Sequence, residues 1–188
     1  MRDLDIRPAT SWDDMRTVFG PRGAYSGCWC MWFRLSGPEF RDTPADGRRE
    51  RLQGLVEGSE RAPGVLAYLS GAPVGWCAVA PREEHARLLR SPVVRPATPG
   101  EAGVWSVTCF YVRREGRGRG VSAALLHGAV EYAASQGARV VEGYPKDSEK
   151  RVGAEELYHG WRGLFEGAGF EEVERRSPTR PIMRRTLT

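Results

Sequence analysis

The chain has 188 residues, of which 40% are hydrophobic and 28% are charged, and a formal net charge of +4. This balance is typical of a globular protein, and the absence of any apolar run near ~20 residues excludes a membrane-spanning helix. The N-terminus lacks the apolar core of a signal peptide, so we expect a cytoplasmic location, and the basic excess is too small to indicate nucleic-acid binding by itself.

The first predicted elements are a strand and a short helix. The segment LDIRPAT, residues 4–10, alternates apolar and polar side chains and predicts the strand. The helix is predicted over 11–20, because Thr10 or Ser11 can accept a hydrogen bond from its first turn and Gly20 can end it.

The next part of the chain predicts a helix followed by a hairpin. Residues 21–40 are rich in aromatic residues and glycine and predict no regular element. A helix is predicted over 43–58, with Thr43 as its cap and Pro44 at its first position. Residues 64–81 predict two strands joined by the turn Ser-Gly-Ala-Pro.

The second half of the chain alternates between strands and helices. A short helix is predicted over 82–91, and a proline-rich loop follows it. The nearly continuous apolar run VWSVTCFYV at 104–112 indicates a strand buried on both faces. A helix over 121–138, with an apolar stripe and a stop at Gly137, leads to another buried strand at 139–145.

The last predicted elements are a helix over 156–169 and two strands over 170–177 and 180–187. The strand–helix–strand order of the second half predicts a parallel strand pair with a right-handed crossover. We therefore predict one α/β (α+β) domain over 1–188, with a central mixed, twisted sheet of about six or seven strands flanked by helices.

The junction between the strand at 104–112 and the next helix has the composition of a phosphate-binding turn. Gly118 and Gly120 immediately precede the helix, where small residues let an anion approach the free N–H groups of the first turn. Arg117 and Arg119 can add charge-assisted contacts to phosphate. A basic surface loop is the alternative, because a Gly-Arg run alone is weakly specific.

This junction and a second motif near the C-terminus resemble the signatures of the GNAT family of acyl-CoA N-acetyltransferases. The first signature is a strand, a turn and a helix. In the turn, a Gln, Arg or Glu is followed three positions later by Gly and five positions later by Gly or Ala. Glu115, Gly118 and Gly120 match this turn. The second is a helix that ends in Y-x-x-x-G-F before a strand, where Gly169 and Phe170 are in register. The order of elements agrees over nearly the whole chain.

The resemblance implies a fold, a donor and a binding site. It implies a GNAT-like domain in which 104–176 binds acetyl-CoA, or another acyl-CoA, as co-substrate without a metal. The pyrophosphate of coenzyme A would lie on the turn, and its pantetheine arm would run along the strand before it, which must splay from the strand at 139–145. A backbone N–H of that strand could then polarise the thioester carbonyl. The implied cofactor-binding residues are Phe110, Tyr111, Val112, Arg117, Gly118, Arg119, Gly120, Val121 and Ser122.

Two departures from the family pattern concern proton transfer. The tyrosine that often acts as the general acid corresponds to Phe165, and Ser106 stands where some members carry a glutamate base. Tyr158 and His159, which precede Phe165 on the predicted helix, are therefore the candidate catalytic residues. Further substitutes on the neighbouring predicted strand are Glu142 and Tyr144.

The aromatic segment near the N-terminus is the candidate acceptor site. Trp29, Trp32 and Phe33 can line an acceptor pocket, because early segments flank the acceptor side in this family. Residues 28–62 would then form an acceptor-side insertion. The alternative is that these rings fill the core beneath a long loop.

The four cysteines predict neither a disulfide scaffold nor a metal site. They are sparse, and although Cys28 and Cys30 form a C-x-C pair, no second pair stands at zinc-ligand spacing. Either thiol could carry an acyl group as a nucleophile, but no activating residue is adjacent. We therefore expect reduced, mostly buried thiols.

The resemblance implies an N-acyltransferase that moves an acetyl or similar acyl group from acyl-CoA to a primary amine of a small molecule or peptide. Two alternatives remain open: an enzyme that uses aminoacyl-tRNA, which the basic balance supports, and a non-catalytic module that binds acyl-CoA. We expect no membrane partner and, apart from tRNA, no nucleic acid; the sequence is compatible with a monomer or a homodimer.

Overall fold

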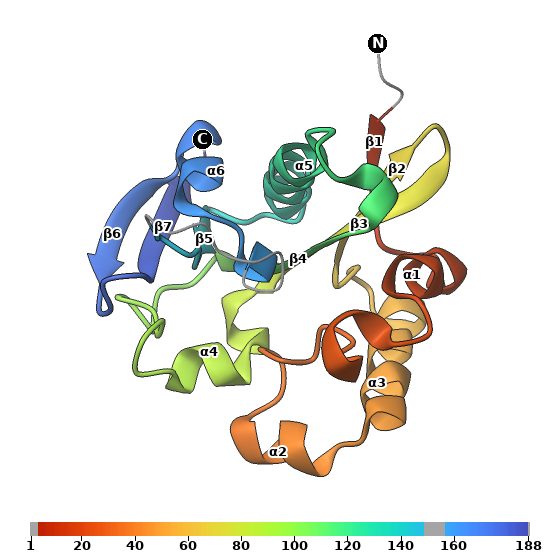
Figure 1. Ribbon diagram of the computed structural model, residues 1–188. Coiled ribbons are helices and arrows are strands. Elements are labelled where there is room, and N and C mark those ends of the chain that lie inside the picture. Colours follow the sequence, from red (N-terminus) through yellow and green to blue (C-terminus); the bar gives the residue numbers. More distant parts are fainter. Residues whose placement is uncertain (1–3, 149–156, 188) are drawn as a thin grey trace.

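The computed structural model describes residues 4–148 and 157–187, whose strands form one seven-stranded sheet in the order β1-β2-β3-β4-β5-β7-β6 (Figure 1). The strands are β1 (Leu4–Pro8), β2 (Gly64–Leu69), β3 (Ala72–Pro81), β4 (Val104–Val112), β5 (Val140–Gly143), β6 (Glu171–Arg175) and β7 (Pro181–Thr186). The helices are α1 (Trp12–Phe19), α2 (Gly37–Asp42), α3 (Ala45–Gly58), α4 (Ala86–Arg90), α5 (Val121–Ser135) and α6 (Arg162–Gly167). Short helical turns are η1 (Gly23–Gly27), η2 (Arg82–Glu84), η3 (Arg114–Gly116) and η4 (Leu157–His159).

The sheet is mixed, as predicted. β4 and β5 are parallel, whereas the other neighbouring strands pair antiparallel. Helix α5 connects β4 to β5, which confirms the predicted strand–helix–strand unit. The described residues therefore form a single α/β domain whose one parallel pair lies near the middle of the sheet.

Helices cover both faces of the sheet (Figure 1). The apolar stripe of α5 packs on one face, where Leu125 and Leu126 join a core cluster with Val107 of β4. Helices α1 and α3 pack on the other face, where Met15 and Leu52 join a second cluster. Successive side chains of β4 point to opposite faces, so this strand contributes to both clusters.

Of the two helix caps predicted near the N-terminus, one is observed and the other is not. Ser11 caps α1 as expected, because its Oγ accepts a hydrogen bond from the Asp14 N–H at 3.2 Å. The helix predicted over 43–58 is observed as α3, but its predicted cap was wrong: Pro44 is the cap, and Thr43 instead ends α2. Helix α2 was not predicted, although Ser36 and Glu39 form a capping box that the sequence contains.

The helix predicted over 156–169 is observed only in part: α6 covers Arg162–Gly167, and Leu157–His159 form η4 instead. The backbone of Gly160 has a φ of 75°, a left-handed conformation that ends η4 and separates it from α6. Tyr158 and His159 consequently lie on η4, ahead of α6 rather than on the same helix as Phe165. Residues 149–156, where the predicted helix would begin, lie outside the described part of the chain.

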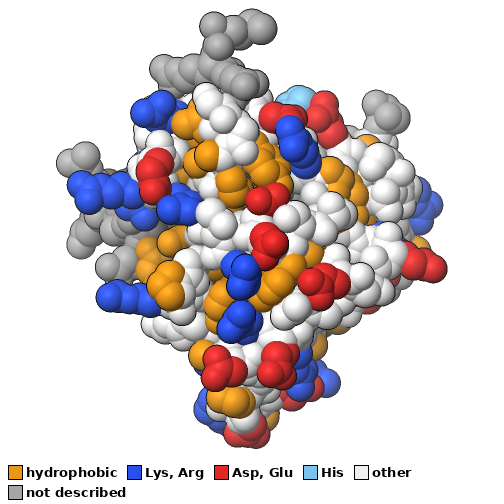
Figure 2. All heavy atoms as spheres, turned by 90° about the vertical axis from the view of Figure 1, so that its right-hand side faces the viewer, with side chains coloured by type: hydrophobic (Ala, Val, Ile, Leu, Met, Phe, Trp, Pro, Cys, Tyr) orange, Lys and Arg blue, Asp and Glu red, His pale blue; other side chains and the backbone are white. Residues whose placement is uncertain are grey.

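In residues 4–148 and 157–187, every helix is too short or too polar to cross a bilayer. On the face seen in Figure 2, basic and acidic side chains are interspersed with hydrophobic ones instead of gathering into a patch of one sign. That face therefore has no extended basic stripe of the kind that tracks a nucleic-acid backbone.

Candidate functional site

The strands β4 and β5 separate halfway along β4. They pair only from Val104 to Val107 on β4, and β4 continues to Val112 without β5 beside it. The backbone N–H of Arg113 donates to the Val74 carbonyl of β3 at 2.8 Å. Because backbone groups alternate along a strand, the N–H and carbonyl groups of Phe110 and Val112 face the open side.

Aromatic packing fills the wedge between the separating strands. A Cβ on Gly143, the last residue of β5, would lie 2.0 Å from the ring of Phe165, so only glycine fits there. Phe165 is fully buried, and its ring packs edge-on against Phe110 and Phe170 at centroid distances of 6.1 and 5.1 Å. The side chain at the position of the family's tyrosine is therefore part of the core.

A β-bulge in β4 lies next to this wedge. The register with β3 shifts between Ala78 and Val79, which leaves Thr108 without a partner residue. The carbonyl of Thr108 accepts a hydrogen bond from His159 Nδ1 at 3.2 Å, and its Oγ1 lies 3.4 Å from His85 Nε2. Burial lowers the pKa of both His159 and His85 to about 3, so both rings are neutral at physiological pH.

The turn after β4 presents backbone N–H groups to solvent. Gly118 and Gly120 have φ values of 69° and 79°, and nothing lies within 4 Å of where a Cβ would stand on either. Among the backbone hydrogen bonds of the described residues, none uses the amides of 118–123 as donors, as expected at the first turn of a helix. Arg117 and Arg119 are exposed on the same turn, and Arg117 Nε donates to the Val112 carbonyl at 3.3 Å.

Two adjoining cavities flank the open half of β4. The smaller, of about 140 Å³, lies beside the turn, and its lining consists of Tyr25, Phe110, Tyr111, Val112, Arg117, Ser122, Tyr158 and Trp161. The larger, of about 240 Å³, lies between β4 and the N-terminal segment, and its lining consists of Phe19, Ala24, Tyr25, Ser26, Cys28, Cys30, Trp32, Phe33, Phe40, Thr108, Cys109, Phe110, Tyr111 and Tyr158. Four aromatic residues, Tyr25, Phe110, Tyr111 and Tyr158, line both cavities.

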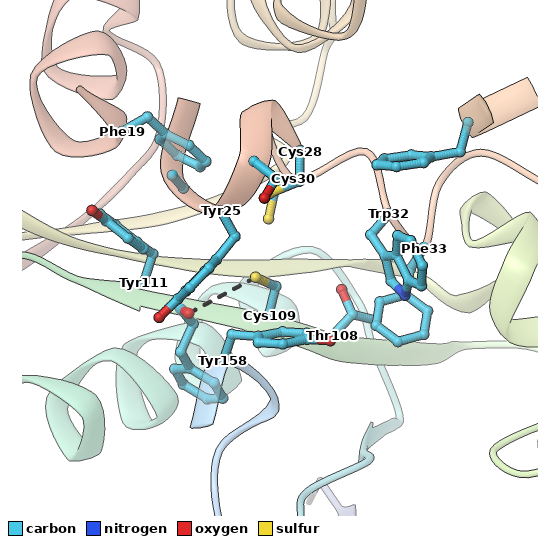
Figure 3. A pocket seen from close by; sticks show the side chains of 14 residues that line it. Phe19, Tyr25, Cys28, Cys30, Trp32, Phe33, Thr108, Cys109, Tyr111 and Tyr158 are labelled. Atoms are coloured by element: carbon cyan, nitrogen blue, oxygen red, sulfur yellow. Dashed lines mark hydrogen bonds between the residues drawn. The ribbon is translucent and has the colours of Figure 1, made fainter. Parts of the chain in front are cut away.

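Figure 3 shows how the larger cavity is enclosed. Side chains of the N-terminal segment form one wall and those of β4 the other. Tyr25, Tyr111 and Tyr158 gather at one end, and Trp32 and Phe33 stand at the opposite end. The first group adjoins the smaller cavity, so a molecule that enters from the turn and one that enters beside Trp32 would meet between them.

The structure brings most of the predicted site residues together. Phe110, Tyr111, Val112, Arg117 and Ser122 line the smaller cavity, and the remaining predicted cofactor-binding residues lie on the turn beside it, at Gly118, Arg119, Gly120 and Val121. Of the predicted acceptor residues, Trp32 and Phe33 line the larger cavity.

Trp29 does not line either cavity, contrary to the prediction. Its ring is buried and stacks on Phe19 at 5.6 Å, beneath Gly23, where a Cβ would approach the Trp29 indole to 2.3 Å. Trp29 and Cys30 have φ values of 44° and 54°, and these two left-handed residues turn the chain between Trp29 and Trp32. Trp29 therefore fills the core, whereas Trp32 reaches the cavity.

The two candidate catalytic residues occupy different environments. Tyr158 lines both cavities. His159 is buried, lies outside both linings and packs edge-on against Phe33 at 5.3 Å. The hydrogen bond from His159 to Thr108 instead supports the bulge of β4.

The further substitutes, Glu142 on β5 and Tyr144 directly after it, belong to a buried network away from the cavities. Tyr144 OH donates to Glu142 Oε2 at 2.8 Å and lies 2.9 Å from Ser106 Oγ. Glu142 also pairs with Arg82 at 3.1 Å, and both side chains are almost fully buried. Burial and the nearby Glu142 carboxylate raise the pKa of Tyr144. These groups stabilise the sheet and do not face a ligand space.

Three thiols line the larger cavity. Burial raises the pKa of Cys28 to about 11, and the pKa of Cys109 is also raised, chiefly by its hydrogen bond to Cys30. Burial opposes ionisation of Cys30 as well, but hydrogen bonds from Cys109 and from Trp76 Nε1, which lies 2.9 Å from Cys30 Sγ, lower its pKa. No group of three metal-ligating side chains is found in residues 4–148 and 157–187.

Several site residues were not predicted from the sequence. Tyr25 lies on η1 within the unassigned segment, and Thr108 and Cys109 lie on the predicted strand without any motif. His85 reaches the bulge from the turn after β3. The density of aromatic residues and glycines in 21–40 was the one available signal for the cavity wall.

Comparison with known proteins identifies relatives by family and by fold. The model of the acetyltransferase (GNAT) family matches residues 29–161. No curated protein matches the chain.

Solved structures share the fold at low sequence identity. The PaiA N-acetyltransferase of Thermoplasma acidophilum in complex with coenzyme A is 13% identical with a TM-score of 0.56, covering 98% of this chain and 99% of that one. The yncA protein of Salmonella typhimurium, solved with its cofactor acetyl-CoA, is 15% identical with a TM-score of 0.56, covering 98% and 94%. The ribosomal-protein-alanine N-acetyltransferase of Brucella melitensis is 15% identical with a TM-score of 0.56, covering 97% and 99%.

Proposed function

Because the chain belongs to the GNAT acetyltransferase family, we propose that it transfers an acetyl group, or a similar acyl group, from acyl-CoA to a primary amine. The observation that carries this proposal is the meeting of two sets of backbone groups that have no neighbouring strand or helical turn as partner. The open side of β4 at Phe110 and Val112 leads to the free amides of the turn at 118–123, and the smaller cavity lies beside both.

The described residues fit coenzyme A as a ligand. The amides of the turn and the guanidinium groups of Arg117 and Arg119 would hold the pyrophosphate, because a helix N-terminus and arginine both favour anions. The backbone of Phe110 and Val112 would pair with the pantetheine arm, as a strand pairs with its neighbour. The open space above Gly118 and Gly120 lets the phosphates approach the backbone.

The chemistry would take place where the two cavities adjoin. Bound acyl-CoA supplies an activated thioester there. The N–H of Phe110, on the open side of β4, would donate to the carbonyl oxygen and stabilise the negative charge that develops on it. Tyr158, which lines both cavities, would donate a proton to the departing sulfur, and His159 would position the bulge through Thr108.

The proposal is tested by a charge reversal at the turn. Gly118→Asp places a carboxylate where the pyrophosphate would lie, so we expect coenzyme A to bind about tenfold more weakly or worse by isothermal titration calorimetry. Gly71→Asp is the matched control, because Gly71 has a similar φ of 81°, equally open surroundings and a place on the β2–β3 turn. Undiminished binding to Gly118→Asp, or no binding to the natural chain, would overturn the proposal.

A further inference from the structure

The lining of the larger cavity restricts the class of acceptor further than membership of the family does. Eight of its fourteen lining residues are aromatic, and none of the fourteen carries a charged side chain. A carboxylate or a phosphate buried there would lose its hydration without gaining a partner among these residues. The cavity therefore selects against acceptors that carry negative charge on the part they bury.

The end of the cavity farthest from the donor is shaped by rings. Trp32 and Phe40 pack edge to face at 5.0 Å, and Phe33 stands beside Trp32 at the same end (Figure 3). The Arg87 guanidinium stacks on the Trp32 ring at 3.9 Å but is not part of the lining, so it holds the ring from outside. Flat apolar walls of this kind favour a planar apolar ligand.

This end also reaches the surface. Trp32 is 40% exposed, whereas Cys30 and Phe33 beside it are buried. An acceptor needs its own path to the thioester, separate from the donor channel beside the turn. An acyl chain carried in by the donor would need no such opening, so the exposed rim favours the acceptor as occupant.

We propose that the acceptor is an arylalkylamine, a primary amine joined to an aromatic ring by a short alkyl chain, with the ring held among Trp32, Phe33 and Phe40 and the amino group directed toward Phe110. This proposal rests on the proposed function and adds the substrate class to it. Burial also favours the neutral amine over its ammonium form, and the neutral amine is the nucleophile.

The reaction balances without a further reagent. The ammonium form loses one proton to solvent before attack. The nitrogen lone pair then forms the amide C–N bond, and the C–S bond breaks with its electron pair remaining on sulfur. The second nitrogen proton replaces the one that Tyr158 gives to sulfur. The products are the N-acylated arylalkylamine, free thiol and one proton in solvent.

The first test compares amines with the natural chain. Thiol release from acetyl-CoA is measured with phenethylamine and tryptamine, with putrescine and spermidine, and with alanine. We expect kcat/KM for the arylalkylamines to exceed that for the others about tenfold or more. Equal or better use of the polyamines or alanine would overturn the proposal, and so would a preference for phenylacetyl-CoA over acetyl-CoA without any preference among amines. If no amine releases thiol and coenzyme A does not bind, the proposed function itself fails.

Two tryptophans provide a matched pair of variants. Trp32 lines only the larger cavity and Trp161 only the smaller, and they are similarly exposed at 40% and 44%. We expect Trp32→Ala to raise KM for tryptamine about tenfold while the Kd of coenzyme A stays unchanged. We expect Trp161→Ala to raise the Kd of coenzyme A instead. An unchanged KM for tryptamine in folded Trp32→Ala would overturn the proposal.

Discussion

The side chain of Tyr158 lies where the two cavities adjoin, and the ring of Tyr25 packs beside it at 5.9 Å. If Tyr158 protonates the departing sulfur, Tyr158→Phe keeps the ring and removes the proton donor. We expect kcat to fall about a hundredfold or more, because general acid catalysis contributes that much. The Kd of coenzyme A, measured by calorimetry, should stay within a factor of about two.

A second tyrosine serves as the control for this variant. Tyr132 on α5 donates its hydroxyl to the Ala62 carbonyl at 3.2 Å and lines neither cavity. Tyr132→Phe should therefore keep its kcat. A normal kcat in Tyr158→Phe would assign the proton to water and leave Tyr158 a packing role.

Other features of the site could not be predicted residue by residue. Trp29 and Trp32 are three positions apart, yet the left-handed backbone at Trp29 and Cys30 sends one to the core and the other to the cavity. The residue types at these two positions do not predict a left-handed backbone. The bulge at Thr108 is equally hidden, because it depends on the register with β3 and on a ring supplied by His85.

At the scale of elements, the separation of β4 from β5 depends on Gly143 and Phe165. A methyl group at Gly143 would lie 2.0 Å from the Phe165 ring. We expect Gly143→Ala to reduce the free energy of unfolding by about 1–3 kcal/mol, measured by urea denaturation, because the core must shift to admit it. The double variant Gly143→Ala/Phe165→Leu should lose less than the sum of the single changes, because the two sites are in contact.

A glycine-to-alanine substitution on α3 should instead stabilise the protein. Gly54 lies on the exposed side of α3 with nothing within 4 Å of its Cβ position. Gly54→Ala should raise the free energy of unfolding by about 0.5–1 kcal/mol, because alanine favours a helix interior. Equal changes in the free energy of unfolding at Gly54 and Gly143 would contradict the packing described between β4 and β5.

Elements with strong local signals were the predictable part of the fold. The hairpin of β2 and β3, the apolar β4 and the striped α5 were predicted close to their observed bounds, because periodicity and turn residues agree there. The helix predicted over 156–169 is observed only over Arg162–Gly167 among its described residues, because Gly160 adopts a left-handed conformation in place of a helical one. The strand-to-helix turn was predictable because Gly118 and Gly120 immediately precede the apolar stripe of α5, although a Gly-Arg run alone is weakly specific for a ligand.

At the scale of the whole molecule, buried histidines make stability depend on pH. Burial lowers the pKa of His85 and His159 from 6.5 to about 3. The unfolded chain therefore binds more protons between these values, so stability is full above pH 6.5 and falls as the pH drops toward 3. Between pH 6 and 5, where carboxylates stay ionised, each histidine should contribute a loss of up to about 1.4 kcal/mol per pH unit.

Single substitutions separate the contributions of the histidines. His85→Gln should reduce the slope of unfolding free energy between pH 6 and 5 by about half, as measured by urea denaturation. A slope near zero in the natural chain would mean that the two rings are protonated within the folded protein.

The short pairing of β4 with β5 has a mechanical consequence. Four residue pairs join the two strands and include every residue of β5, and β7 and β6 continue the sheet on the other side of β5. Looser packing of the Phe165 ring against Gly143 would let β5, β7 and β6 tilt together about these four pairs. Such a tilt would change the width of the open side of β4 without any change in the residues that line the two cavities.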